Sequence, residues 1–219
     1  MYVKNVAIDR LFEVKLKRQW TCQSCNGATR RRGADWGLHV SILRRERRDD
    51  PIKRLSEHIR EHFRPDNIAK RCNSAKCGGR RSAEREFISS GPEILIFQAN
   101  RTDYDKDRGV PYKNTDRVPL DKYLDLSEHT TPTIGAEPKM ALRYKLFGVV
   151  SHAGANPTSG HYISTVRCRN GVDFAQISDT VITDVAVDRA SPTLNIDDAV
   201  SQSYVLVYQK IGGEMVRRI

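Results

Sequence analysis

Long hydrophobic runs are absent from this sequence. No segment approaches the roughly 18 consecutive apolar residues that a membrane-spanning helix requires. The first nine residues contain no apolar core of signal-peptide length. The sequence also lacks internal repeats and low-complexity tracts. These absences exclude a helical membrane protein and a repeat array, and they predict a protein of the cytoplasm, the nucleus or both.

Cysteine is scarce, and its placement is informative. Four of the five cysteines form two close pairs, Cys22-x-x-Cys25 and Cys72-x4-Cys77, which are separated by 46 residues. Such pairs fit an intracellular metal site better than a secreted disulfide framework. Four thiolates complete a closed tetrahedral shell around Zn²⁺, which leaves no open position for water and implies a structural role. Free buried cysteines are the alternative, and the paired spacing favours zinc.

Acidic residues are scarce relative to basic ones in residues 1–90. Of the 219 residues, 1–90 hold 22 Lys and Arg against 11 Asp and Glu, whereas 91–219 hold 15 against 16. The basic excess therefore lies in the segment that carries the cysteine pairs. It fits a surface for nucleic acid or another acidic partner, or a solvated strand and loop face. No aromatic residues interleave with Arg30–Arg32 or Arg44–Arg48 to stack bases, so the solvated face is favoured and nucleic acid is not an expected partner.

The residue pattern predicts an α+β domain built round an antiparallel sheet. Residues 51–63 have apolar side chains at helical spacing, and Asp49 or Asp50 is placed to cap a helix that has Pro51 as its first residue. Polar loops are expected at 101–116 and 129–139. The expected strands are 11–16, 39–43, 93–99, 142–150, 161–167, 173–178 and 203–210.

The stretch from His58 to His62 matches the H-x-x-E-H pattern of one metallopeptidase class. A catalytic zinc there would need a third, distant ligand, and nothing else in the sequence suggests a hydrolytic metal centre. The polar face of the helix that buries Ile59 and Phe63 explains the stretch better.

The most specific pattern is a histidine-rich stretch near the C-terminal end. Ser151-His152-Ala153-Gly154 leads through Ser159-Gly160-His161-Tyr162 into an apolar run. This stretch resembles the histidine box of ubiquitin-specific proteases, the papain-like deubiquitinases. The resemblance covers nearly the whole chain, because other segments follow in the family's order. They include the first cysteine pair after Leu11-Phe12, the proline-led strand from Gly91, the segment at 118–127 and the closing strand at 199–208. After the proline-led strand, the family's usual Arg-Phe is here Arg101-Thr102.

The resemblance implies a papain-like palm with an antiparallel sheet, joined to zinc-binding β fingers, with the family's thumb missing. Residues 1–90 would form the fingers-like subdomain and residues 91–219 the palm. It also implies a cysteine-type deubiquitinase whose partners are ubiquitin and ubiquitinated proteins.

The same resemblance assigns the catalytic histidine to His161 and the orienting carboxylate to Asp179, with Asp184 as a weaker candidate for the carboxylate. His152, Gly160 and Tyr162 would contact substrate. A hydrogen bond that supports the loop explains His152 equally well.

The cysteine that His161 should activate is not visible in this sequence. Cys168 lies seven residues beyond His161 on one expected strand, which places it roughly 23 Å away at about 3.3 Å per residue. A nucleophile must lie within hydrogen-bond reach of its base, so Cys168 fails. Three explanations stay open: a fragment or truncated gene model, a half enzyme completed by another chain, or an inactive ubiquitin-binding module. A basic zinc module that binds nucleic acid is a further, weaker alternative.

Overall fold

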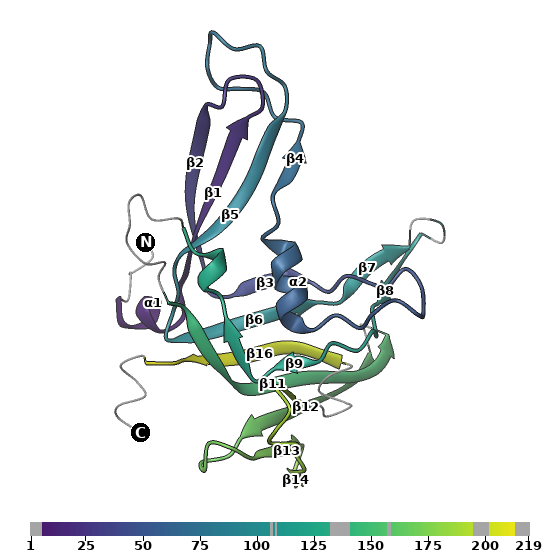
Figure 1. The fold of residues 1–219 in the computed structure, drawn as a ribbon. Coiled ribbons are helices and arrows are strands. Elements are labelled where there is room, and N and C mark those ends of the chain that lie inside the picture. Colours follow the sequence, from purple (N-terminus) through teal and green to yellow (C-terminus); the bar gives the residue numbers. More distant parts are fainter. Residues whose placement is uncertain are drawn as a thin grey trace, which may run out of the picture.

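The computed structural model describes residues 6–105, 107, 109–131, 141–156, 159–194 and 202–212. Two sheets dominate it: a four-stranded sheet projects like an arm from an eight-stranded sheet, and helix α2 (Leu55–His62) lies near the junction (Figure 1). None of the helices in the described part of the chain is long and apolar enough to cross a membrane.

The four-stranded sheet comes from two separate parts of the chain. Its order is β2-β1-β5-β4, with β1 Val14–Cys22, β2 Ala28–Asp35, β4 Asp66–Ile68 and β5 Ser82–Ser90. The predicted strand at 11–16 was placed too early, because α1 (Val6–Phe12) includes Leu11 and Phe12, and the Glu13 amide donates to the Asp9 carbonyl. An alternation of only six residues fits the last turn of a helix as well as the start of a strand.

The eight-stranded sheet contains most of the predicted strands. Its order is β14-β13-β12-β11-β16-β6-β3, and β10 also pairs with β11. Its strand pairs are antiparallel except β3 with β6, which are parallel. The strands are β3 Leu38–Ser41, β6 Ile94–Asn100, β10 Tyr123–Asp125, β11 Arg143–Asn156, β12 Ser159–Arg167, β13 Phe174–Ser178, β14 Val181–Val185 and β16 Ser203–Lys210.

Smaller elements complete the fold. They are β7 (Thr102–Asp105), β8 (Val110–Lys113), β9 (Leu120–Asp121), β15 (Thr193–Leu194) and the 3-10 helix η1 (Ser127–His129). The prediction of a loop throughout 101–116 was wrong, since β7 and β8 form an antiparallel hairpin. Gly109 has a φ of 69° beside the start of β8, a conformation that suits a turn and that glycine adopts without strain. Of the loop predicted at 129–139, residues 132–139 lie outside the described residues.

Helix α2 begins four residues later than the sequence predicted. Its N-cap is Arg54, whose backbone amide donates to Glu57 Oε2 at 2.7 Å. The Ser56 amide donates to Asp121 Oδ2 at 2.8 Å. A carboxylate from β9 therefore takes the capping role predicted for Asp49 or Asp50. Ile52, expected on the apolar face of the helix, is 46% exposed.

The core lies between α2 and the eight-stranded sheet. Leu55 and Ile59 are fully buried, and they belong to one cluster with Leu38, Val40 and Phe97 of the sheet. Residues 38–62 thus pack with the strands that follow residue 90, although they precede it in the chain. The division of the chain at residue 90 stays a prediction.

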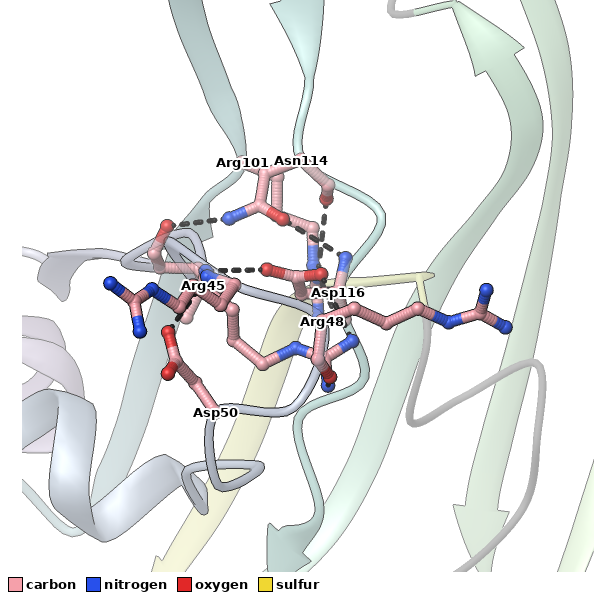
Figure 2. Close-up of polar contacts among 8 residues, drawn as sticks. Arg45, Arg48, Asp50, Arg101, Asn114 and Asp116 are labelled. Atoms are coloured by element: carbon pink, nitrogen blue, oxygen red, sulfur yellow. Dashed lines mark hydrogen bonds and ion pairs between the residues drawn. The ribbon is translucent and has the colours of Figure 1, made fainter.

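A buried arginine joins several strand ends (Figure 2). Arg101, at the end of β6, is 1% exposed. Its guanidinium donates to the carbonyls of Ser203, Asn114 and Asp116 at 2.7, 3.2 and 2.9 Å. Burial lowers the pKa of Arg101 to about 10. The Asp116 carboxylate accepts from the backbone amide of Arg45 at 2.8 Å, so the segment after β3 is tied to the same network.

Candidate functional site

The histidine-rich stretch forms the hairpin of β11 and β12. His161 lies opposite Ala153, and Tyr162 lies opposite His152. Gly160 is required by close packing, because a Cβ added to it would lie 2.5 Å from both the Ala153 carbonyl oxygen and His152 Nε2. The sequence therefore places His161 at the start of a strand whose neighbouring residues are tightly fixed.

His161 faces a carboxylate and a hydroxyl from the next hairpin. Its Nε2 lies 2.9 Å from Ser178 Oγ and 3.8 Å from Asp179 Oδ2. Ser178 ends β13, and Asp179 follows with a φ of 51° in the left-handed region that asparagine and aspartate tolerate. The His161 side chain is 44% exposed and that of Asp179 is 81% exposed. The two predicted catalytic residues are therefore close together and accessible to a substrate.

Sequence reasoning missed Ser178 as a neighbour of His161. Its only signal was its place beside Asp179 at a strand end. Asp184, the weaker carboxylate candidate, lies opposite Ala175 near the far end of β14. Within the described residues, no hydrogen bond or ion pair joins Asp184 to a histidine.

The residues expected to contact substrate differ in exposure. Tyr162 is 61% exposed, whereas His152 is only 4% exposed. Lys113 Nζ lies 3.1 Å from His152 Nδ1. Burial and, secondarily, the nearby Lys113 charge lower the pKa of His152. The structure therefore gives His152 the surroundings of a supporting side chain, the alternative left open by the sequence.

The two cysteine pairs meet at the tip of the four-stranded sheet. Their four sulfur atoms lie within 4.8 Å of one another, with Cys22 Sγ 3.8 Å from Cys77 Sγ and Cys25 Sγ 3.7 Å from Cys72 Sγ. These two separations match the tetrahedron edge of about 3.8 Å that Zn–S bonds of about 2.3 Å imply. The cluster is close enough to bind a metal ion.

Backbone amides donate hydrogen bonds to two of the four sulfur atoms, although the pKa is lowered for Cys22 and raised for Cys25 and Cys72. The amide of Ser24 donates to Cys22 Sγ at 3.4 Å, and that of Ser74 donates to Cys72 Sγ at 3.4 Å. Hydrogen bonds from backbone amides, that of Ser24 first, lower the pKa of Cys22 to about 6. A Cβ added to Gly79 would lie 2.7 Å from Cys22 Sγ. A glycine is therefore needed where the backbone passes this sulfur.

The histidines of the H-x-x-E-H stretch have separate structural partners. His58 is 4% exposed, and its Nδ1 accepts from the Leu43 amide at 3.3 Å. Burial lowers the pKa of His58 to about 4. His62 Nε2 instead lies 3.6 Å from Glu86 of β5. Among the described residues, the four cysteines form the one group of three or more ligands close enough to hold a metal ion.

Comparison with known proteins agrees with this arrangement. The family model described as ubiquitin carboxyl-terminal hydrolase matches residues 3–208. Ubiquitin carboxyl-terminal hydrolase 4 of Arabidopsis thaliana is 25% identical over 94% of this chain and 54% of its own length. Ubiquitin carboxyl-terminal hydrolase creB of Emericella nidulans is 27% identical over 96% of this chain and 26% of its own length.

The solved structures show the same fold. A chain of the SAGA Ubp8/Sgf11/Sus1/Sgf73 DUB module bound to ubiquitin aldehyde matches with a TM-score of 0.76 and 19% identity. The match covers 93% of this chain and 42% of the solved one. The predicted α+β class, with an antiparallel sheet and a cysteine cluster on a smaller sheet, is confirmed.

This chain thus spans about half the length of the Arabidopsis relative and less of the other two proteins. The family match nevertheless runs through both sheets and past the histidine hairpin. The chain belongs to the ubiquitin carboxyl-terminal hydrolase family.

Proposed function

We propose that this chain supplies the base and the orienting carboxylate of a cysteine-type deubiquitinase. The observation that carries the proposal is the exposed His161 imidazole within 3.8 Å of the Asp179 carboxylate. A carboxylate so placed holds the ring orientation and stabilises the imidazolium that forms during acyl transfer. The substrates would be ubiquitin conjugates, in keeping with the family.

The nucleophile has to come from outside these 219 residues. Four of the five cysteines lie in the cysteine cluster. Cys168 follows the last residue of β12, where its backbone amide donates to the Asp173 carbonyl. The extended strand between it and His161 separates them by roughly 23 Å.

In the complete site, His161 would remove the proton from the incoming thiol. The thiolate would attack the carbonyl of the isopeptide bond after the C-terminal glycine of ubiquitin. His161 would then return the proton to the departing lysine amine as the C–N bond breaks and a thioester remains. Water, deprotonated by the same imidazole, would hydrolyse the thioester and release both ubiquitin and the thiol.

We also propose that the cysteine cluster binds one structural Zn²⁺. The sulfur separations, the amide donors and the glycine beside Cys22 Sγ fit a closed four-thiolate site. The ion would hold the tip of the four-stranded sheet together and would take no part in the chemistry.

A ubiquitin probe with a thiol-reactive C-terminus tests the enzymatic proposal. The 219-residue chain alone should remain unlabelled. Fusing it to a cysteine-bearing N-terminal portion of a relative should restore cleavage of a ubiquitin conjugate. His161→Ala should then lower the rate at least about a hundredfold, whereas Asp184→Ala should leave it close to that of the unsubstituted fusion.

Three results would count against the proposal. Specific labelling of the chain alone, lost on His161→Ala, would reveal a nucleophile within these residues. Full activity of the His161→Ala fusion would show that the base is misassigned. An inactive fusion that still binds ubiquitin would favour the rival function, a ubiquitin-binding module without catalysis.

A further inference from the structure

A lysine with no assigned role lies beneath the histidine hairpin. Lys113, the last residue of β8, is 7% exposed. Its Nζ lies 2.7 Å from the carbonyl oxygens of His152 and Gly154, and 2.7 Å from Gln202 Oε1. His152 Nδ1 is the fourth neighbour, at 3.1 Å. The ammonium group therefore joins β8, the end of β11 and the residue before β16.

This ammonium is held without a carboxylate partner among the described residues. Burial and then the Arg101 charge lower the pKa of Lys113. The carbonyl oxygens and Gln202 Oε1 must compensate for the loss of water. The same Gln202 oxygen also accepts from the Gly154 amide at 3.2 Å. Gly154 is thus held from both its carbonyl and its amide side.

The position of Lys113 favours one tautomer of His152. An ammonium group has donors only, so the tautomer compatible with Lys113 Nζ at 3.1 Å has a lone pair on His152 Nδ1 and the proton on Nε2. That Nε2 lies 2.5 Å from the position of a Cβ on Gly160, the residue before His161. The ring also lies 4.9 Å from the Tyr162 ring and 5.7 Å from the Tyr204 ring, measured between centroids. His152 therefore packs on the residues that flank His161.

We propose that Lys113 is a positioning residue for His161. It acts by fixing the His152 ring and the two carbonyls that flank Ala153, the residue paired with His161 across the hairpin. Its effect on catalysis rests on the proposed deubiquitinase function, whereas its effect on the hairpin does not.

The chain offers a matched control for this lysine. Lys122 is also 7% exposed, and its Nζ also donates to two backbone carbonyls, those of Asp188 and Ser191. Those carbonyls lie in the segment between β14 and β15, and neither belongs to the histidine hairpin. Lys122→Met and Lys113→Met therefore remove similar groups from different places.

The test is ¹⁵N NMR of the histidine rings in the 219-residue chain. In the unsubstituted chain, His152 should show an unprotonated Nδ1 and a protonated Nε2. Lys113→Met should mix the two tautomers of His152 and shift the ring and amide signals of His161. Lys122→Met should leave both residues unchanged, and Lys113→Arg should restore part of the original spectrum.

Unchanged His152 and His161 signals in folded Lys113→Met, or equal shifts in Lys122→Met, would overturn the proposal. If Lys113→Met does not fold, the same NMR measurement on Gln202→Leu tests the proposal instead. It removes one acceptor of the ammonium group and should shift the same signals by less. Unchanged signals in that variant would count against the proposal equally.

Kinetics on the fused enzyme separates this proposal from the function it rests on. Lys113→Met should lower kcat about tenfold with little change in KM, because a misplaced base slows the chemical step more than binding. An inactive unsubstituted fusion would contradict the deubiquitinase function and leave the NMR result standing. An active fusion whose kcat is equally reduced by Lys122→Met would contradict the positioning role.

Discussion

At the residue scale, the buried basic side chains are stabilised in the same way, by hydrogen bonds to backbone carbonyls. Arg101, Lys113 and Lys122 each donate to two or more backbone carbonyls. Carbonyls at strand ends and in connecting segments lack sheet partners, and a buried polar group without a partner is costly. One long basic side chain can therefore satisfy several such carbonyls at once.

The buried histidines are expected to make the fold sensitive to mild acid. The pKa of His58 falls from about 6.5 to about 4 on folding, chiefly through burial. Above pH 6.5 both folded and unfolded chains hold it neutral. As the pH falls from 6.5 to 4, the unfolded chain binds a proton that the folded chain does not, so stability decreases by at most about 3 kcal/mol.

Urea unfolding at pH 7.5 and pH 5 measures this effect. His58→Gln should reduce the loss of stability between the two pH values, whereas His39→Gln, at an exposed position, should not. An undiminished loss in the His58 variant would assign the acid sensitivity to other groups.

Residue-scale details of the site were only partly predictable from the sequence. His161 and Asp179 come from strand ends next to a glycine and a turn, which are local patterns. Ser178 shares its strand end with Asp179, but only the folded chain shows it to be a neighbour of His161, and Lys113 has no local signal. The closeness of Lys113 to His152 arises from packing between residues 39 positions apart.

At the element scale, the start of α2 shows why local patterns fail. Asp49, Asp50 and Pro51 have the right identities for a helix start, yet the helix begins at Leu55. The Leu55 amide donates to the Pro119 carbonyl and the Ser56 amide to the Asp121 carboxylate. Both acceptors come from the β9 region more than 60 residues later, so a sequence window around the helix contains the Arg54–Glu57 contact but neither of these acceptors.

Removal of this distant cap should destabilise the protein. Asp121→Ala takes away a charge-assisted acceptor at the N-terminus of α2 and should cost about 1–2 kcal/mol of unfolding free energy. Asp49→Ala should change it by less than about 0.5 kcal/mol, as expected of an exposed residue outside the helix. Urea denaturation compares the two variants. Equal losses of unfolding free energy in the two variants would indicate that Asp49, in the segment before Leu55, caps the helix as much as Asp121 does.

The tip of the four-stranded sheet should depend on the proposed Zn²⁺. Metal analysis of the purified chain should find about one Zn²⁺ per molecule. Cys72→Ser should remove it, whereas Cys168→Ser should retain it. Hydrogen exchange should then increase near Cys22–Asn26 and Cys72–Cys77 while the core strands β6 and β16 stay protected. A metal-free chain with a protected tip would refute the site.

At the scale of the whole molecule, the α+β fold class and the positions of most strands could be predicted from the sequence. Which strands belong to which sheet could not. Alternating and apolar runs located most strands of the eight-stranded sheet. The parallel pairing of β3 with β6 joins Leu38 to Phe97 across nearly 60 residues. Such long-range pairing leaves no periodic signal in either strand, and it places residues 38–62 with the large sheet.

The net charge of +10 should not produce tight binding to nucleic acid. The strand register gathers Lys17 and Arg32 as direct partners, with Arg30 opposite Gln19, on one face of the four-stranded sheet. The aromatic residue opposite Lys17 on the neighbouring strand β5, Phe87, is only 6% exposed and lies under the Arg85 guanidinium, so it is not free to stack bases. Titration of the chain with RNA and DNA at physiological salt should give only weak association, while ubiquitin binds detectably. Tight, steeply salt-dependent nucleic-acid binding without ubiquitin binding would reverse our preferred function.

The four-stranded sheet is built from two separate chain segments, so its two cysteine pairs are synthesised at different times. During synthesis, Cys22 and Cys25 are made about 50 residues before Cys77 completes the cluster. At roughly 5–20 residues per second, the delay lasts on the order of 3 to 10 s. For that interval the first pair is a dithiol with half a coordination shell, open to oxidants and to competing metal ions. The cluster is therefore most vulnerable before the ribosome has finished the chain.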